Sequence, residues 1–368
     1  MADGCAYRLG ILTSTAILIC RVGDATPLFF TTLIMENLAR KSITTSRSLE
    51  YTYYCSQPTA DSAGKPALFF IHGFPDHAYM WNDIIAQLLH LPYRIIAPDL
   101  LGYDGTAKPT DPSQYAYSLQ AKDLREILAA ENISSVIVVG HDWGSAMTQR
   151  FYLHYPDIVV GLVLLNVAYL VPNPSQKFHL DTVNDLTEKF YGYPMYAYWD
   201  LFTADDAPSL LSANLDRAYE VWHGDPKDWM RTQFCTRGAM RKYLNGEEER
   251  VQLKKYAQEE RWKKHFFDRF ERDGFEAPFC WYKAMKDNIQ TEDDAKIPPE
   301  RYRISVPLLF IGATGDAVCR IDAMDDAKGK GLVPDLEEKV IESGHWSPME
   351  KPEEIAVLVK DFLGRRFS

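Results

Sequence analysis

The chain has 368 residues, of which 46% are hydrophobic and 25% charged, and its formal net charge is −11. A chain of this length can bury a large core. The acidic balance, with no long basic run, argues against nucleic acid and anionic membranes as partners. The six cysteines are scattered and show no metal-ligand spacing, which favours free thiols in a reducing, cytoplasmic compartment.

The first 34 residues share no pattern with the rest of the chain. The apolar stretch from Leu9 to Cys20 is too short to span a membrane. With Asp3 and only one basic residue, Arg8, before it, it also makes a poor signal peptide. Met35 would serve as a natural start. We therefore expect residues 1–34 to be a dispensable extension, a weak targeting segment or a poorly ordered arm, and we expect no membrane anchor.

Apolar runs alternate with helical periodicity in the first half of the chain. Strands that alternate with helices predict a doubly wound, mostly parallel sheet flanked by helices, which is an α/β fold. In chain order, the patterns predict an edge strand at 49–55, buried strands at 67–71 and 93–98, a helix at 115–131, a buried strand at 136–139, a helix at 145–154 and a strand at 159–166.

The pattern changes after Val171. The following residues are strongly aromatic and helical in periodicity, with no convincing strand. Strand patterns return at 306–311 and 338–341, followed by an amphipathic helix at 352–363. We therefore predict that an inserted helical cap divides the α/β core, with core segments at 35–171 and 301–368 and the cap at 172–300.

The pentapeptide Gly140-His141-Asp142-Trp143-Gly144 directly follows the apolar strand 136–139. A buried strand that enters a sharp turn between two glycines is the layout of a nucleophile elbow. Its central residue is Asp142, where a serine would form acyl-enzymes. A carboxylate is ordinarily ionised at neutral pH, so it can attack an sp3 carbon without a base and form an alkyl ester. This chemistry points to epoxides or haloalkanes as substrates.

Two later loops offer catalytic partners for Asp142, in the chain order acid and then histidine. Asp316 follows the strand at 306–311, and His345 follows the strand at 338–341. His345 is expected to act second, by deprotonating the water that hydrolyses the ester, while Asp316 orients it. The rivals of Asp316 are its near neighbours in the sequence, Asp322, Asp325 and Asp326.

Ester hydrolysis passes through an oxyanion, which needs hydrogen-bond donors. We expect them to be the backbone N–H groups of Trp143 and of Phe74, in the loop His72-Gly73-Phe74-Pro75. His72 and His141 are expected to stabilise their turns. Ring opening of an epoxide also leaves an alkoxide, to which a neutral phenol can donate. The predicted cap offers Tyr191, Tyr193, Tyr196, Tyr198 and Tyr282.

Three motifs together resemble an epoxide hydrolase of the α/β-hydrolase fold. They are His72-Gly73-Phe74-Pro75-Asp76, the elbow at 140–144, and Gly344-His345-Trp346-Ser347-Pro348. The chain is similar, from about 48 to 365, to the hydrolase domain of soluble epoxide hydrolases and to single-domain plant and fungal relatives. The resemblance implies conversion of epoxides to vicinal diols through an alkyl-aspartate intermediate, and it favours Asp316 over its rivals.

The resemblance also implies the two tyrosines that activate the epoxide oxygen. Trp281-Tyr282-Lys283 is similar to the family's Trp-Tyr-basic motif and points to Tyr282. The second tyrosine follows a proline in the first half of the cap, which matches Tyr198. In better-known members glutamine follows this tyrosine, whereas here Trp199 does, so Tyr196 remains a rival.

The expected substrate is a small apolar epoxide, with water as the second reactant. No metal or organic cofactor is implied, because the nucleophile, base and acid are all side chains. The sequence allows a homodimer. An aromatic cap indicates an apolar pocket, and we expect four residues to bind substrate: Phe74, Trp143, Trp199 and Trp346.

Two other functions fit part of this pattern. A haloalkane dehalogenase shares the fold and the aspartate nucleophile, but it needs side-chain N–H donors for the halide, and Phe74 offers none where such enzymes commonly carry asparagine. The motif around Tyr282 also favours epoxides. A catalytically dead member of the fold that acts as a receptor or scaffold would usually have lost part of the constellation, and here each part is present.

Overall fold

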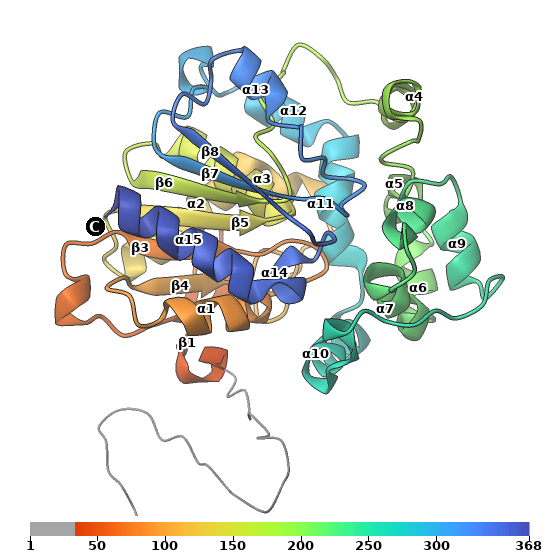
Figure 1. The fold of residues 1–368 in the computed structure, drawn as a ribbon, viewed down its shortest axis with the longest axis horizontal. Coiled ribbons are helices and arrows are strands. Elements are labelled where there is room, and N and C mark those ends of the chain that lie inside the picture. The colour runs from red at the N-terminus through yellow and green to blue at the C-terminus, as the bar shows by residue number, and fades with distance from the viewer. Residues whose placement is uncertain (1–33, 368) are drawn as a thin grey trace, which may run out of the picture. The chain divides into compact units, whose positions relative to one another are not determined.

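The computed structural model describes residues 34–367, so the predicted extension 1–34 lies outside the described residues apart from Ile34. In the described part of the chain, eight strands form one sheet in the order β1-β2-β4-β3-β5-β6-β7-β8 (Figure 1). The strands are β1 (Ala39–Thr44), β2 (Glu50–Cys55), β3 (Ala67–Ile71), β4 (Ile95–Pro98), β5 (Val136–His141), β6 (Val159–Leu165), β7 (Leu308–Ala313) and β8 (Leu336–Ile341).

The sheet is mostly parallel, as predicted. Only β1 with β2 and β2 with β4 pair antiparallel. The central strands β3, β5 and β7 are buried along their whole length, which explains their continuous apolar sequences. The prediction of an edge strand at 49–55 is wrong in one respect, because β1 covers β2 and forms that edge. The sequence of β1, Ala-Arg-Lys-Ser-Ile-Thr, is largely exposed and carries no apolar alternation.

Helices cover both faces of the sheet. Leu68 and Phe70 of β3 join a core cluster with helices α1 (Asn82–Leu88) and α15 (Pro352–Arg366). The alternate residues Phe69 and Ile71 point to the opposite cluster, which includes apolar residues of α2 (Tyr117–Ala130) and α3 (Trp143–His154). This alternation follows from the two-residue period of a strand and gives the sheet an apolar core on each side.

The chain between β6 and β7 is helical, and its only β-pairing among the described residues is an isolated bridge between Gly224 and Leu253. We call this region the helical insertion. Two short helices, α13 (Asp325–Gly329) and α14 (Ser347–Glu350), lie outside it. The helices of the insertion are α4 (Leu180–Tyr191), α5 (Trp199–Phe202), α6 (Ala207–Ser212), α7 (Leu215–His223), α8 (Trp229–Phe234), α9 (Ala239–Leu244), α10 (Glu260–Asp273), α11 (Glu276–Lys286) and α12 (Ile289–Asp294).

Met35, the proposed natural start, is built into the core. Its side chain is buried, and its backbone N–H donates to Asn82 Oδ1 at 3.0 Å. A chain that began at Met35 would place a charged α-ammonium group at this buried position, which carries a desolvation cost. Within residues 34–367, no helix combines the length and apolarity needed to cross a membrane.

A buried ion pair joins the helical insertion to the α/β part. Arg150 on α3 donates from Nε and Nη2 to the two carboxylate oxygens of Asp294 at the end of α12, each at 2.7 Å. The third arm of the guanidinium, Nη1, donates to the carbonyl oxygen of Leu170 at 2.7 Å. Both charged side chains are almost fully buried, so each is compensated mainly by the other.

Replacing Asp294 with alanine should lower the free energy of unfolding by about 3 kcal/mol, because it leaves the Arg150 guanidinium buried without its counter-charge. Urea denaturation measures this change. The double variant Arg150→Met with Asp294→Leu removes both charges and should recover most of the loss. Equal stability of the Asp294→Ala variant and the unmodified protein would show that the pair contributes nothing.

Candidate functional site

The three residues predicted to form the catalytic centre meet at one edge of the sheet. Asp142 follows β5, Asp316 follows β7 and His345 follows β8, and the carboxyl ends of these parallel strands lie together. His345 Nδ1 lies 2.6 Å from Asp316 Oδ2, and its Nε2 lies 3.4 Å from Asp142 Oδ2. The structure thus brings the predicted nucleophile, base and orienting acid into contact. The rivals of Asp316 are exposed: Asp322, Asp325 and Asp326.

The turn at Asp142 places a non-glycine residue in a strained backbone conformation, with φ at +54°. The turn closes so tightly that a Cβ atom on Gly140 would overlap the Gly144 carbonyl and Thr148 Oγ1. A Cβ atom on Gly144 would likewise overlap the Ile71 carbonyl. Both flanking glycines are therefore needed for steric reasons, as the elbow interpretation requires.

The carboxylate of Asp142 accepts a hydrogen bond from one of the two groups expected to stabilise the oxyanion. The Phe74 backbone N–H donates to Asp142 Oδ1 at 2.8 Å. A Cβ atom on Gly73 would lie only 2.5 Å from that same oxygen, so the loop can approach because residue 73 is glycine. Trp143 is the first residue of α3, where a backbone N–H has no partner within the helix. The Phe74 N–H therefore contacts the carboxylate, and the Trp143 N–H directly follows Asp142 in the chain with no partner inside the helix.

Asp316 is held by four hydrogen bonds. Oδ1 accepts from the backbone N–H groups of Val318 at 3.0 Å and Cys319 at 2.9 Å, while Oδ2 accepts from His345 and from Asn166 Nδ2 at 2.8 Å. Ser347 Oγ donates in turn to Asn166 Oδ1 at 2.6 Å. The sequence predictions missed Asn166 and Ser347. The available signal was that Asn166 ends a predicted strand at the edge of the sheet that carries the site.

Charges and hydrogen bonds among Asp142, Asp316 and His345 shift the pKa values of His345 and Asp316. Burial alone would lower the pKa of His345, but the Asp316 carboxylate, aided by hydrogen bonding to Asp142 and Asp316, raises it well above its usual value. Burial would raise the pKa of Asp316, yet the charge of His345 and the hydrogen bonds from His345, Cys319 and Asn166 hold it below its ordinary value. The pair with Asp316 therefore favours the protonated form of His345.

The other two histidines of the motifs have structural partners. His141 Nε2 lies 2.7 Å from the His345 carbonyl oxygen, which links the elbow to the loop of the base. His72 Nε2 accepts from the backbone N–H of Leu100 at 2.8 Å. Burial lowers the pKa of His72 to about 3 and that of His141 to about 4, so both rings are neutral. These contacts join each ring to another loop, so the expectation that they stabilise their own turns stays a prediction.

A cavity of about 550 Å³ opens onto the Asp142 carboxylate. Trp143 and Trp199 line it, as predicted for substrate-binding residues. Phe74 and Trp346 are not among the residues that line it, so the expectation that they bind substrate stays a prediction. Phe74 packs behind it in a cluster of aromatic rings, and Trp346 packs against His223, Phe234 and His345.

Tyr198 lines the cavity together with Asp142, whereas Tyr282 is not among the lining residues and packs against Trp143 and Tyr198. The rings of Tyr198 and Tyr282 are 6.1 Å apart, and Tyr282 packs edge-on against Trp143 at 5.2 Å. Burial, with a smaller contribution from the charge of Asp142, raises the pKa of each phenol well above its usual value. Both hydroxyl groups are therefore neutral and can donate a hydrogen bond.

The rival Tyr196 has different surroundings. It also lines the cavity, and burial raises its pKa, but the acidic groups that act on it are those of Cys319, Cys235 and Asp316. Asp142 acts on Tyr198 and not detectably on Tyr196. This difference favours Tyr198 as the tyrosine nearer to the reacting centre.

Two clusters of possible metal ligands occur among the described residues. Asp316, Cys319 and His345 form one, but the Asp316 carboxylate is already saturated with hydrogen bonds. His77, Asp99 and Asp104 form the other. The guanidinium groups of Arg269 and Arg272 act electrostatically on this second cluster, as its pKa shifts record, and they oppose a bound cation. Neither cluster supports a cofactor role.

Known proteins share both the sequence and the fold of this chain. Residues 66–352 match the family model described as alpha/beta hydrolase fold. An epoxide hydrolase 2 of Siraitia grosvenorii is 33% identical over 308 residues, which cover 81% of this chain and 92% of the relative. This chain belongs to the epoxide hydrolases of the α/β-hydrolase fold.

Bacterial and plant epoxide hydrolases are similar along almost their full length. Epoxide hydrolase A of Mycobacterium tuberculosis is 29% identical over 83% of this chain and 92% of its own length. The solved structure of potato epoxide hydrolase I superimposes with a TM-score of 0.70 at 26% identity, covering 89% of this chain and 99% of that one. The family therefore includes single-domain members from several kingdoms.

Proposed function

We propose that this protein hydrolyses epoxides to vicinal diols through a covalent ester on Asp142. One observation carries the proposal. The Asp142 carboxylate faces an aromatic cavity, is held by the Phe74 N–H, lies 3.4 Å from the base His345 and has two neutral tyrosines beside it. This neighbourhood supports the assignment of Asp142 as nucleophile, His345 as base and the two tyrosines as donors to the leaving oxygen.

In the first step, an oxygen of the Asp142 carboxylate attacks a ring carbon of the epoxide. The hydroxyl groups of Tyr198 and Tyr282 donate to the epoxide oxygen, and one of them supplies a proton as the C–O bond breaks. No base is needed, because the attacking oxygen is already an anion. The product of this step is a β-hydroxyalkyl ester of Asp142.

The second step needs His345 to lose its proton. While Asp142 is ionised, His345 sits between two carboxylates, and its pKa is raised. Formation of the ester removes the negative charge of Asp142, so the pKa of His345 should fall. The imidazole can then take a proton from water, which attacks the ester carbonyl. The proton that His345 loses passes to the tyrosinate left by ring opening. The N–H groups of Phe74 and Trp143 stabilise the resulting oxyanion, and its collapse expels the alkoxide of the diol, which takes a proton from His345. The Asp142 carboxyl group then returns its proton to His345.

The cavity favours a small, largely apolar epoxide, since aromatic and aliphatic side chains dominate its lining near Asp142. Water is the second reactant. The reaction as drawn needs no cofactor. A cytoplasmic location and a homodimer remain part of the proposal, on the basis of the scattered cysteines and the sequence alone.

Haloalkane dehalogenation is the second candidate, and one observation supports it. The indole N–H groups of Trp143 and Trp199 are buried, and the structure gives neither a hydrogen-bond partner among residues 34–367. Both side chains line the cavity, and such donors could hold a departing halide. The two tyrosines are better explained by an epoxide oxygen, which must be protonated, than by a halide, which leaves as an anion.

Product analysis with styrene oxide and, separately, with 1-chlorohexane distinguishes the candidates. We expect diol from styrene oxide, no halide from 1-chlorohexane, and loss of diol formation in the Asp142→Ala variant. Chloride release without diol would assign the protein to the dehalogenases. Neither product would favour a receptor or scaffold, and diol formation that survives in the variant would reject the mechanism.

The His345→Gln variant should accumulate the ester intermediate, because alkylation needs no base whereas hydrolysis does. We expect turnover to fall about 10³-fold. Intact-protein mass spectrometry should show one added epoxide, and peptide mapping should place it on Asp142. An unmodified variant, still folded but inactive, would mean that His345 is required for alkylation itself.

The variants Tyr198→Phe and Tyr282→Phe should each slow alkylation by about 10- to 100-fold, since each removes one donor to the developing alkoxide. The double variant should be nearly inactive. Single-turnover measurement of ester formation isolates this step. Tyr196→Phe serves as the matched control and should alkylate at nearly the normal rate. The reverse result for Tyr196 and Tyr198 would exchange their roles.

A further inference from the structure

Arg269 on helix α10 is a buried cation whose surroundings are unusual. Its guanidinium makes no ion pair within 4.0 Å among the described residues, although its side chain is almost fully buried. Burial lowers its pKa, and the carboxylates of Asp76, Asp104 and Asp99 oppose that effect from a distance. A buried charge without a close counter-charge is costly, so its position calls for an explanation.

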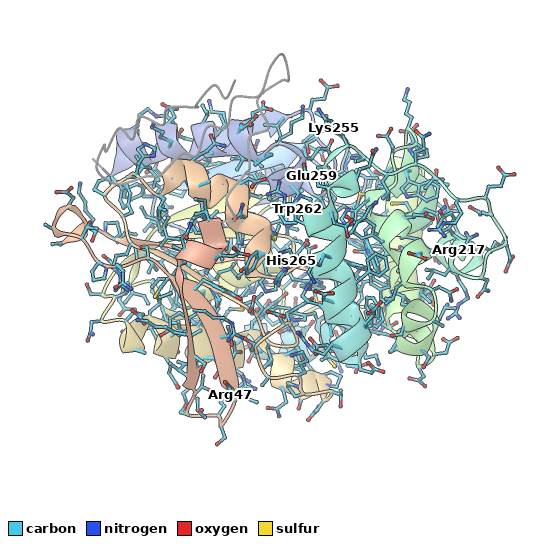
Figure 2. All side chains as sticks on the ribbon, turned by 90° about the horizontal axis from the view of Figure 1, so that it is seen from below. Arg47, Arg217, Lys255, Glu259, Trp262 and His265 are labelled. Carbon is cyan, nitrogen blue, oxygen red and sulfur yellow. The ribbon has the colours of Figure 1, made fainter. Side chains whose placement is uncertain are left out.

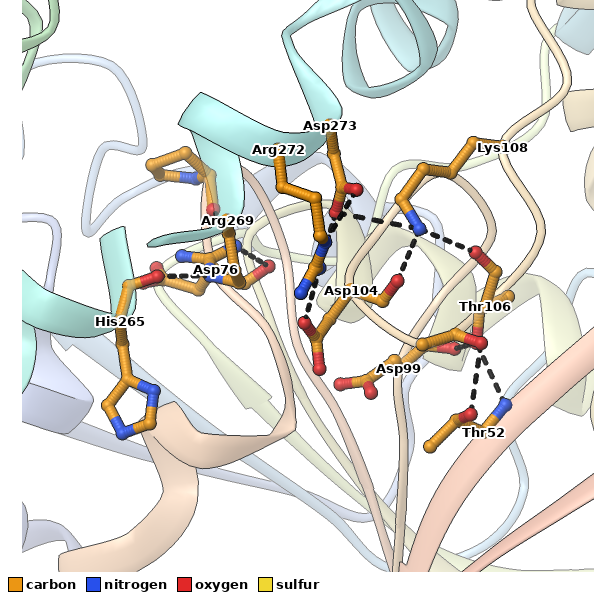
Figure 3. A network of polar contacts seen from close by, with 12 residues as sticks. Thr52, Asp76, Asp99, Asp104, Thr106, Lys108, His265, Arg269, Arg272 and Asp273 are labelled. Carbon is orange, nitrogen blue, oxygen red and sulfur yellow. Dashed lines mark hydrogen bonds and ion pairs between the residues drawn. The ribbon is translucent and has the colours of Figure 1, made fainter. Parts of the chain in front are cut away.

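The guanidinium binds the loop that carries the oxyanion donor. Arg269 Nη1 donates to the Pro75 carbonyl oxygen at 2.9 Å and, more weakly, to the Asp76 carbonyl oxygen at 3.4 Å. Its Nε donates to the carbonyl oxygen of His265 on the same helix at 2.9 Å. Figure 3 shows Arg269 between the residues His265 and Asp76, with these contacts as dashed lines.

These contacts continue through two peptide groups to the nucleophile. The peptide that joins Pro75 to Asp76 accepts from Arg269 through its carbonyl and donates through its N–H to the Gly73 carbonyl oxygen at 2.9 Å. The peptide that joins Gly73 to Phe74 accepts this bond and donates through its N–H to Asp142 Oδ1 at 2.8 Å. Each group in such a chain polarises the next, so a cation at one end strengthens the donor at the other.

We propose that Arg269 is a positioning residue for the oxyanion hole, which it aligns and polarises through the peptides Pro75–Asp76 and Gly73–Phe74. The proposal rests on the proposed function, since it assigns the Phe74 N–H to the oxyanion of ester hydrolysis. It also makes one residue of the helical insertion part of the catalytic arrangement of the α/β part. Loss of Arg269 should weaken ester hydrolysis and leave the attack of Asp142 on the epoxide nearly intact.

A purely structural role of Arg269 would be to fasten α10 to the α/β part. Another arginine of α10 also fastens the helix to the α/β part, but it does not contact the two peptides that link Arg269 to Asp142, which we call the relay. Arg261 forms a two-pronged ion pair with Asp83 on α1, with both distances at 2.7 Å. Figure 2 shows α10, with Trp262 and His265 labelled, along the side of the α/β part. Arg261→Met is therefore a matched control that breaks a contact between the same two parts.

The kinetic test follows a single turnover of styrene oxide and separates ester formation from ester decay. In Arg269→Met we expect ester decay to slow about 10-fold or more, with ester formation changed less than about 3-fold. Arg269→Lys keeps a donor and a charge and should recover part of the loss. Arg261→Met should change neither step. Equal slowing of both steps in Arg269→Met, or no slowing of decay, would overturn the proposal.

A second measurement tests the relay without turnover. In protein labelled with ¹⁵N-phenylalanine, the Phe74 amide proton, identified by its loss in Phe74→Tyr, should shift upfield in Arg269→Met, by a smaller amount in Arg269→Lys, and not in Arg261→Met. An unshifted amide would overturn the proposal even if catalysis changed. This result also stands apart from the proposed function, because a protein that forms no diol would still show the amide shift if the relay exists. Where Arg269→Met does not fold, Arg269→Lys provides both readouts.

Discussion

The arrangement around Asp142 depends on steric closure of the turn between β5 and α3. The backbone of Asp142 has a positive φ, and the chain on either side of it packs against the carbonyl oxygens of neighbouring loops with no room for a Cβ atom at Gly140 or Gly144. Because this packing includes the end of β3, the same turn brings the Phe74 N–H to the carboxylate. The strained turn at Asp142 therefore places its carboxylate within reach of the Phe74 N–H and of His345.

In the proposed mechanism, the charges around His345 determine that the ester forms before the base acts. His345 lies between two carboxylates, and the charge of Asp316 with hydrogen bonding to both raises its pKa. Only a reaction that neutralises Asp142 changes this balance, and esterification is such a reaction. The base would thus become available after the ester has formed and not before. Asp316 keeps its charge throughout, since four hydrogen bonds saturate its oxygens, and the fixed acid can hold the ring in one orientation while its partner changes charge.

Local sequence patterns predicted most of the fold and the centre of the site, for a physical reason. Buried parallel strands such as β3 and β5 require continuous apolar runs, and the strained turn requires glycines at fixed positions, so both leave a signature in neighbouring residues. β1 was missed because an exposed edge strand needs no apolar pattern. Arg269 and Asn166 were missed because their partners lie at least 150 residues away in the sequence or are backbone atoms, which have no residue type to recognise.

In the proposed reaction the helical insertion must do more than cover the cavity, because its tyrosines have to donate to the epoxide oxygen, which is bonded directly to the ring carbon that Asp142 attacks. Apolar packing alone is weakly directional and would leave the angle of the insertion poorly defined. Polar contacts are directional, and they join the two parts at separate places: the buried pair of Arg150 with Asp294 on α12, the half-buried pair of Arg261 with Asp83, and Arg269 with the Pro75 carbonyl. A buried ion pair contributes little net stability compared with apolar packing, but it fixes one orientation. Such contacts would matter at this interface if, as proposed, Tyr198 and Tyr282 of the insertion donate to an epoxide oxygen held at Asp142.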